Sequence, residues 1–199
     1  MTRAEDVAAA AELGVDAVGL VFHPESPRNL GVEQARALVA GLPAFVTVTA
    51  LFMDPDTETV REVLSRARVE VLQFHGGEPA EFCRSFGRPY IKAVPMGSGA
   101  ALAEYARHHA QAAALLLDSH VAGQKGGTGV SFDWSAVPKL DGPPLILAGG
   151  LNPGNVAAAI RTVRPYGVDV SSGVERAPGI KDRDKMAAFV HEVNHVALA

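Results

Sequence analysis

Two glycine-bearing turns near the end of the chain could bind a phosphate group. They are Gly149-Gly150, after the apolar run 145–148, and Ser171-Ser172-Gly173, after the run 168–170. Small residues at a strand end let backbone N–H groups approach an anion closely, and a helix beginning there adds partial positive charge. Two such turns on consecutive β-α units form the phosphate site of many β/α barrels. The alternative is that the glycines only end two strands.

Five polar residues lie where predicted strands end, the edge at which β/α barrels place their catalytic groups. They are Arg28, Gln73, His75, Asp118 and Asp169. Asp118 directly follows three leucines, and a carboxyl group that is poorly solvated on one side has a raised pKa, which suits a general acid. Its alternative role is to cap a turn. Arg28 is either a solvated cation or the partner of a substrate carboxylate, and for His75 a hydrogen-bonded structural role is favoured.

Three further features could carry chemistry, and each also has a structural interpretation. Lys92 lies in the strand-like run 90–94 and could point into a barrel and form a Schiff base, although a stabilising role near acidic strand ends is favoured. Cys83 shares one helical stripe with neighbouring phenylalanines and is expected to pack against the sheet. The glycines within 126–129 lack the spacing of a nucleotide-binding P-loop.

Short apolar runs typical of strands alternate with helical patterns along the chain. The predicted strands cover 17–22, 45–53, 69–74, 90–94, 114–117, 145–148 and 168–170. The predicted helices cover 32–41, 57–67, 78–86, 100–110, 154–163 and 182–196, with a short one after Trp134 and a first helix that begins with a capping box at Thr2. This alternation predicts a parallel sheet with right-handed crossovers, and eight such units make a TIM-type barrel. A doubly wound open sheet is the alternative, ranked lower because such sheets bind ligands at a switch point rather than at their last two strands.

The composition is that of one α/β domain spanning residues 1–199. The chain has 199 residues, 48% of them hydrophobic, which is enough for one core without disulfides. Its one cysteine permits no internal disulfide and favours the reducing cytoplasm. No apolar stretch reaches membrane-spanning length, and a formal charge of −4 offers no basic face for nucleic acid. We therefore expect a cytoplasmic protein that binds a small molecule and neither a membrane nor nucleic acid.

A series of short motifs, in order along the chain, resembles one enzyme family. The motifs lie at 14–22, 26–28, 72–76, 91–93, 116–118, 126–134, 148–153, 169–175 and 178–182. Together they resemble phosphoribosylanthranilate isomerase of tryptophan biosynthesis. The resemblance runs from Thr2 to the last predicted helix, and it agrees with the phosphate turns inferred above.

The resemblance implies an Amadori rearrangement that requires neither a cofactor nor a metal. N-(5′-phosphoribosyl)anthranilate would become 1-(2-carboxyphenylamino)-1-deoxyribulose 5-phosphate. In similar enzymes the residue matching Asp118 is the general acid, and the substrate-binding set here would be Arg28, Gln73, His75 and Asp169. The phosphate would rest on Gly126, Gly127, Gly149, Gly150, Ser171, Ser172 and Gly173. Such an enzyme is expected to be a monomer or a homodimer.

One departure from the family concerns the general base. The family's base is a cysteine in a Lys-Ile-Cys-Gly stretch that ends the first strand, immediately before the helix that here begins at Thr2. We therefore expect a (βα)8 TIM-type barrel whose first β-strand is missing from this chain, either through an internal start or truncation or as a natural short form without catalysis. Two other functions stay open: a barrel that binds a phosphorylated ligand without turnover, and a Schiff-base lyase or aldolase that uses Lys92.

Overall fold

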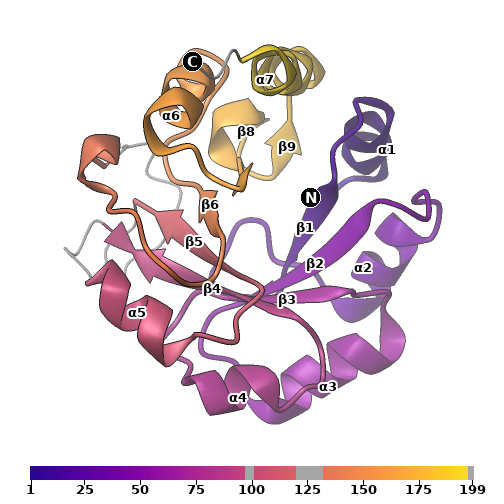
Figure 1. The fold of residues 1–199 in the computed structure, drawn as a ribbon. Helices are drawn as coiled ribbons and strands as arrows, with labels where there is room; N and C mark the ends of the chain where they lie inside the picture. The colour runs from indigo at the N-terminus through magenta and orange to yellow at the C-terminus, as the bar shows by residue number, and fades with distance from the viewer. Residues whose placement is uncertain (97–100, 120–131, 197–199) are drawn as a thin grey trace.

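A curled sheet of parallel strands forms the centre of the molecule (Figure 1). The computed structural model describes residues 1–96, 101–119 and 132–196. Within these residues, seven strands pair in the order in which they occur in the sequence. They are β1 (Ala17–Val21), β2 (Thr47–Phe52), β3 (Val71–Phe74), β4 (Tyr90–Pro95), β5 (Ala114–Asp118), β6 (Leu145–Leu147) and β7 (Gly167–Val168). Each overlaps one of the strands predicted from the sequence.

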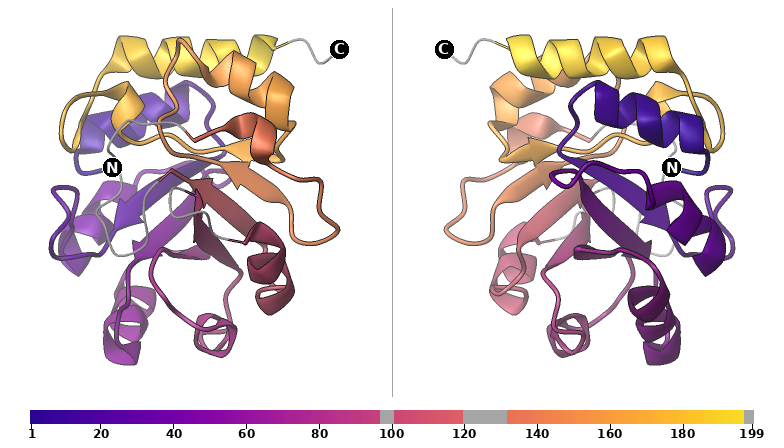
Figure 2. Two further views of the ribbon diagram at one scale, coloured as in Figure 1. Left: turned by 90° about the vertical axis from the view of Figure 1, so that its left-hand side faces the viewer. Right: turned by 90° about the vertical axis from the view of Figure 1, so that its right-hand side faces the viewer.

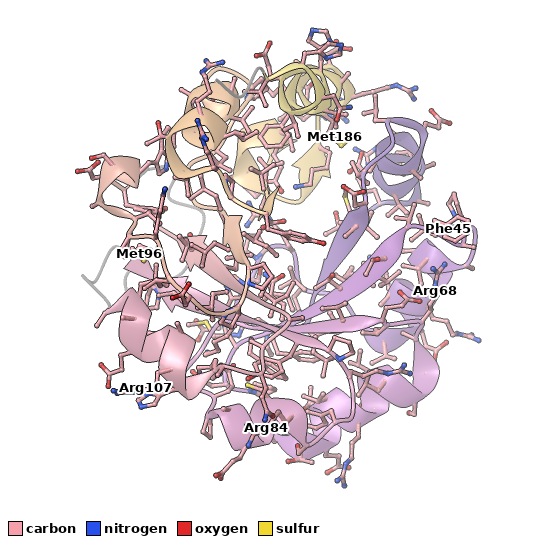
Figure 3. The ribbon with its side chains drawn as sticks, in the orientation of Figure 1. Phe45, Arg68, Arg84, Met96, Arg107 and Met186 are labelled. Atoms are coloured by element: carbon pink, nitrogen blue, oxygen red, sulfur yellow. The ribbon has the colours of Figure 1, made fainter. Side chains whose placement is uncertain are left out.

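Helices follow the strands and lie on the outer side of the curl, as Figures 1 and 2 show. They are α1 (Ala4–Glu12), α2 (Val32–Val39), α3 (Thr57–Arg66), α4 (Ala80–Arg84), α5 (Leu102–His108), α6 (Val156–Val163) and α7 (Arg183–His195), with short 3-10 turns η2 (Trp134–Ala136) and η3 (Ser172–Val174). Charged side chains such as Arg84 and Arg107 project outward from this layer (Figure 3). A doubly wound sheet would carry helices on both faces, so the structure supports the barrel-type prediction.

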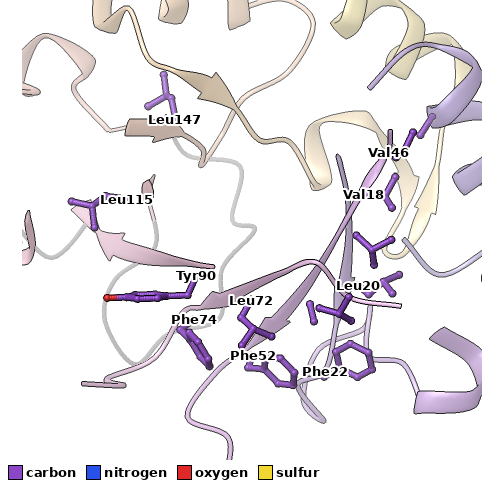
Figure 4. Close-up of a cluster of buried hydrophobic side chains, with 14 of the residues drawn as sticks. Val18, Leu20, Phe22, Val46, Phe52, Leu72, Phe74, Tyr90, Leu115 and Leu147 are labelled. Carbon is purple, nitrogen blue, oxygen red and sulfur yellow. The ribbon is translucent and has the colours of Figure 1, made fainter. Parts of the chain in front are cut away.

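Side chains alternate between the two faces of the sheet, and this alternation divides the core. The larger cluster fills the layer between strands and helices and includes Leu20, Phe52 and Phe74, which are fully buried (Figure 4). A small second cluster on the other face contains Ala93, Leu116 and Ala148, with Ile91 and Ile146 against it. Alternating burial of this kind follows from the two-residue period of a strand. In each strand, every second side chain therefore faces the inside of the curl, and one known residue fixes which ones they are.

The chain after β7 differs from the prediction. Ser172 and Gly173 of the second glycine turn are themselves part of η3, a 3-10 turn of three residues, and no α-helix follows directly. A hairpin of β8 (Glu175–Ala177) and β9 (Ile180–Lys181) then precedes α7. The hairpin turns at Gly179, whose φ of +79° favours glycine.

The start of the first helix also differs from the prediction. Arg3 is the N-cap residue of α1 and makes no side-chain capping bond. The Thr2 hydroxyl instead donates a hydrogen bond to the Gly179 carbonyl oxygen, so the predicted capping box is wrong. A tertiary contact with the hairpin has replaced a local helix cap.

The sheet has two edges, at β1 and at β7. Among the described residues, β1 forms a ladder only with β2 and β7 only with β6. Beyond its ladder, β1 has one isolated bridge from Val21 to Asn29, and the Met1 amino group donates a hydrogen bond to the Gly19 carbonyl oxygen (2.6 Å). A closed barrel needs one more ladder between these edges. The barrel-type curl is confirmed, and the further strand stays a prediction. In the part of the chain that the structure describes, no helix is both long and apolar enough to cross a membrane.

Candidate active site

Four of the predicted site residues share the inner face of the sheet. Leu72 and Phe74 face the helices, so Gln73 between them faces the inside of the curl. His75 lies two residues further on and therefore faces the same side as Gln73. The Gln73 amide and the His75 ring are in contact, which places both on one face. Asp118 has the parity of the inner-facing Leu116 and ends β5. The carboxyl ends of parallel strands meet at one edge, so these side chains gather there.

Asp169 joins this group from the strand end next to β6. Its backbone N–H donates to the Leu147 carbonyl oxygen (2.9 Å), which extends the ladder past β7 and aims the side chain inward. Asp169 is an exposed residue. Desolvation by neighbouring protein groups raises the pKa of its carboxyl group, the Lys181 ammonium opposes the rise, and the negative charge of Asp118 adds to it. The two carboxyl groups are therefore electrostatic neighbours.

Arg28 is held in place by an acidic residue of the hairpin. Its Nε donates to Glu175 Oε1 (2.8 Å) and its Nη2 to Glu175 Oε2 (2.6 Å). Only 16% of the Arg28 side chain and 5% of the Glu175 side chain are exposed. A two-point guanidinium–carboxylate pair fixes the plane of the guanidinium. The interpretation of Arg28 as a solvated loop cation is therefore wrong.

The two glycine turns pack directly against each other. A Cβ atom at Gly173 would lie 1.8 Å from the Leu151 carbonyl oxygen, so only glycine fits there. Gly149 and Gly150 have φ values of +74° and +69°, a conformation that strains other residues. A Cβ atom at Gly149 would also lie 2.3 Å from the Ser119 nitrogen, so the first turn touches the residue after Asp118. The turns and the candidate acid thus form one continuous region.

Asparagine side chains stabilise the first turn. The Asn155 amide oxygen accepts from the Asn152 N–H (2.8 Å), and its Nδ2 donates to the Gly150 carbonyl oxygen (2.9 Å). These bonds set the turn shape immediately before α6, which begins at Val156. The predicted phosphate residues Gly126 and Gly127 lie outside the described residues.

The loop after β3 carries His75 and is fixed by two carboxylates that the sequence did not single out. Asp54 adopts a φ of +47°, rare for a residue with a side chain, and its Oδ1 accepts from the Gly77 N–H (2.7 Å). Glu78 Oε1 accepts from the Asp54 N–H (2.8 Å) and the Gly76 N–H (3.2 Å). The His75 backbone is thus held close to the inner face.

Lys92 lies on the helix side of the sheet and not inside the barrel. Its Nζ contacts Glu78 Oε2 at 2.8 Å and donates to the Gly76 carbonyl oxygen at 2.5 Å. Only 2% of its side chain is exposed. A Schiff base requires an amine that a carbonyl substrate can reach. The aldolase hypothesis is therefore wrong for Lys92, and the stabilising role is supported.

Cys83 is not available for chemistry either. It is fully buried on α4, and burial raises the pKa of its thiol to about 12. The predicted packing role is confirmed.

Glu175 and Lys181 were missed as site residues, although a Pro-Gly turn between them could have indicated the hairpin that pairs them. Across residues 1–96, 101–119 and 132–196, no group of three or more His, Cys, Asp and Glu side chains could hold a metal.

A curled parallel sheet with outer helices and polar residues at its strand ends defines the class of β/α-barrel enzymes. Residues 1–192 match the family model described as N-(5′-phosphoribosyl)anthranilate (PRA) isomerase. The chain belongs to this family. Its relatives include proteins named N-(5′-phosphoribosyl)anthranilate isomerase from Nitrosococcus oceani (50% identical, covering 98% of this chain and 95% of that one) and from Pseudomonas syringae (50% identical, covering 98% and 94%).

Solved structures agree with this assignment. The phosphoribosyl anthranilate isomerase from Thermotoga maritima is 39% identical with a TM-score of 0.88, over 98% of this chain and 95% of that one. A second structure, of the isomerase in complex with reduced 1-(o-carboxyphenylamino)-1-deoxyribulose 5-phosphate, is 37% identical with a TM-score of 0.83, over 98% and 95%.

Proposed function

We propose that this chain isomerises N-(5′-phosphoribosyl)anthranilate to 1-(2-carboxyphenylamino)-1-deoxyribulose 5-phosphate in tryptophan biosynthesis. Family membership supports the reaction, and the site supports it independently. The observation that carries most weight is the contiguity of Asp118 with the Gly149 turn through Ser119. A phosphate on the turns would place the attached sugar beside the acid.

The reaction divides into two proton transfers. Asp118, protonated, gives its proton to the furanose ring oxygen, so the C1–O bond breaks and the nitrogen lone pair forms an iminium. A base then removes the C2 proton, and the electron pair of that C–H bond forms the C1–C2 double bond of an enolamine. Tautomerisation of the enolamine gives the ketone. General acid and base catalysis of this kind needs side chains within hydrogen-bond reach of the reacting atoms.

The remaining residues bind the substrate in this proposal. Arg28 binds the anthranilate carboxylate through donors that Glu175 leaves unused. Asp169 contacts the ribose hydroxyls, and Gln73 and His75 line the same inner face. The phosphate rests on backbone N–H groups of the paired glycine turns, to which Gly126 and Gly127 also contribute. Oriented backbone donors favour a compact dianion without need for net positive charge.

The base is proposed to act from a strand in the gap between β1 and β7. Cys83, the one cysteine of the chain, is buried on the helix side and has a thiol pKa of about 12, so it cannot serve. A strand with a Lys-Ile-Cys-Gly end that pairs with both edges would bring a thiol to the carboxyl end of the sheet.

The experiment compares two versions of the protein that carry such a strand ahead of Thr2, one with cysteine and one with alanine in its place. Loss of substrate fluorescence from the anthranilate group reports turnover. We expect the cysteine version to be about 10² to 10⁴ times faster. Equal rates in both versions would show that another residue, with His75 the first candidate, is the base. Binding of the reduced product without turnover in either version would favour a binding protein.

We further infer a single domain over residues 1–199 that works in the cytoplasm without nucleic acid or membrane partners. The one cysteine and the phosphorylated sugar substrate support this inference. A solved relative is described as a dimeric isomerase from Thermotoga maritima, of which monomers were generated. We propose that this chain is a monomer or a homodimer.

A further inference from the structure

A chain of polar contacts joins Arg28 to the second glycine turn. Glu175 accepts both hydrogen bonds from Arg28, and Lys181 Nζ lies 3.1 Å from Glu175 Oε1. The same Nζ donates to the Ser171 carbonyl oxygen at 2.8 Å. These contacts connect four residues in series: Arg28 in the loop after β1, Glu175 and Lys181 in the β8–β9 hairpin, and Ser171 in the turn after β7.

The two central residues of the contact chain, Glu175 and Lys181, are buried, and a further hydrogen bond supports them. The Glu175 and Lys181 side chains are each 5% exposed. They face each other across the hairpin, where Glu175 and Lys181 are paired residues. The Lys181 N–H also donates to Asp6 Oδ2 (3.1 Å), which ties the hairpin to α1. Such a network has little freedom to adopt other arrangements.

The charges of the cluster leave it suited to bind an anion. Burial would raise the pKa of Glu175, but the hydrogen bond from Arg28 and the charges of Lys181 and Arg28 outweigh it, and the pKa is lowered. Burial lowers the pKa of Lys181, and Glu175 opposes this. Arg28 and Lys181 thus place two basic groups around the one carboxylate of Glu175, while the Asp169 carboxyl group and the Met1 amino group also act on Lys181. Without Lys181, Glu175 would cancel the charge of Arg28.

We propose that Glu175 and Lys181 are positioning residues that fix the distance between Arg28 and the phosphate turn. This proposal rests on the proposed function, in which one substrate carries a carboxylate at one end and a phosphate at the other. Lys181 performs two tasks: it holds the Ser171 carbonyl of the turn and it offsets the charge of the carboxylate that orients Arg28. The network therefore selects ligands whose two anionic groups are separated by one particular length.

The test measures binding of three probes to the protein and its variants by calorimetry. The probes are inorganic phosphate, anthranilate and reduced 1-(2-carboxyphenylamino)-1-deoxyribulose 5-phosphate, which contains both ends. The variants are Glu175→Asp, Lys181→Met and Lys181→Arg. The matched control is Lys185→Met, because Lys185 Nζ also reaches Glu175 but at its backbone oxygen (2.9 Å).

Lys181→Met is expected to weaken the two-ended probe about 10- to 100-fold, a loss typical of a hydrogen bond to a charged group. The KM of the substrate should rise by a similar factor with little change in kcat, since the network acts on binding in ground state and transition state alike. Lys185→Met should change neither value. Glu175→Asp keeps the charge but moves the carboxylate by one methylene, so it should weaken the two-ended probe more than it weakens phosphate alone.

Two outcomes would overturn the proposal. One is unchanged affinity for the two-ended probe in Lys181→Met and Glu175→Asp, measured on variants whose thermal unfolding matches the parent. The other is equal losses for phosphate and for the two-ended probe in Glu175→Asp. If Lys181→Met does not fold, unaltered affinity for the two-ended probe in Glu175→Asp alone has the same meaning. Lys181→Arg keeps the charge and a donor, so it should lose less affinity than Lys181→Met. Failure of the proposed function can be distinguished from failure of the positioning role, because in that case the parent protein itself would not bind the two-ended probe.

Discussion

Asp118 and Asp169 are two carboxyl groups on one inner face with different neighbours. The pKa of Asp169 is raised by burial and by Asp118, while Lys181 opposes the rise. Asp118 ends β5 next to the first glycine turn. Two carboxyl groups with different neighbours on one face can take different roles in one reaction. The sugar ring oxygen is expected beside Asp118, since the turn proposed to bind the phosphate lies against Ser119, the next residue.

Replacing Asp118 with asparagine tests the assignment of the acid. The amide keeps the shape of the side chain but cannot release a proton to the ring oxygen, so turnover by the strand-bearing protein should fall about 10²- to 10⁴-fold. Affinity for the reduced product should change little. Fluorescence of the anthranilate group measures the rate, and calorimetry measures the affinity.

Asp141→Asn is the matched control, because Asp141 is an exposed aspartate outside the site. Undiminished turnover in Asp118→Asn would move the acid role to Asp169, whose raised pKa makes it the next candidate.

Residues whose position follows from a single strand could be placed from the sequence. Gln73, His75, Asp118 and Asp169 each end or follow a predicted strand, so their common edge could be inferred. The partners of Arg28 could not be inferred, because Glu175 lies 147 residues away and reaches it only through the fold. Asp54 was missed for a related reason, since its positive φ depends on contacts with the next loop.

At the scale of elements, the paired glycine turns are the feature most sensitive to substitution. Gly173→Val should abolish binding of inorganic phosphate, because its Cβ atom would lie 1.8 Å from the Leu151 oxygen and the turns would separate. Ser172→Ala removes no backbone donor and should weaken binding less than tenfold, within the range of one net hydrogen bond.

Calorimetry with phosphate measures both effects, and Gly41→Ala is the control, since a Cβ there meets nothing within 4 Å. Retained phosphate affinity in Gly173→Val would remove the glycine turns from the proposed binding site.

The packing of α5 against β4 predicts a pH dependence of stability. His109 is 6% exposed and contacts the Tyr90 hydroxyl. Burial, with the nearby charges of Lys92 and His108, lowers its pKa to about 4. In the unfolded chain the pKa of this histidine is near 6.5. Between pH 6.5 and pH 4 the unfolded chain therefore binds a proton that the folded protein does not, and the free energy of unfolding falls as the pH is lowered through this range.

The free energy of unfolding should fall by no more than about 3 kcal/mol between pH 6.5 and pH 4 through this histidine. Urea unfolding at pH 7.5 and at pH 5 measures it. His109→Gln, which cannot titrate, should show a smaller difference between the two pH values. The exposed His191→Gln should keep the parental difference, because His191 is not among the groups that shift the pKa of His109. Equal differences in His109→Gln and the parent would contradict the assignment.

The elements themselves were the most predictable level of structure. All seven strands were found because apolar runs bounded by turn residues depend on local sequence alone. The hairpin β8–β9 was not found, since strands of three and two residues are too short to show alternation. The prediction of a capping box at Thr2 was wrong because the Thr2 hydroxyl donates its hydrogen bond to Gly179 in this hairpin.

For the whole molecule, we expect the edges of the sheet at β1 and β7 to affect both stability and association in solution. Unpaired edges of a parallel sheet expose backbone donors and acceptors that can associate with other chains. A strand added ahead of Thr2, with alanine in place of its cysteine, should pair with both edges while contributing no catalytic thiol. At about 1 kcal/mol per net hydrogen bond, four new ladder bonds should add several kcal/mol. That gain corresponds to an increase in Tm of about 10 °C for a chain of this size.

Calorimetric unfolding of the two versions measures the shift, and light scattering after size exclusion measures association. The added strand should also reduce concentration-dependent association, because it covers both edges at once. A strand of the same length that carries two prolines serves as the control, since proline cannot donate to the ladders. If that control raises the Tm as much as the alanine strand does, the gain comes from something other than ladder pairing. The gap would then not be the place where the sheet closes, and the base could not be expected to act from it.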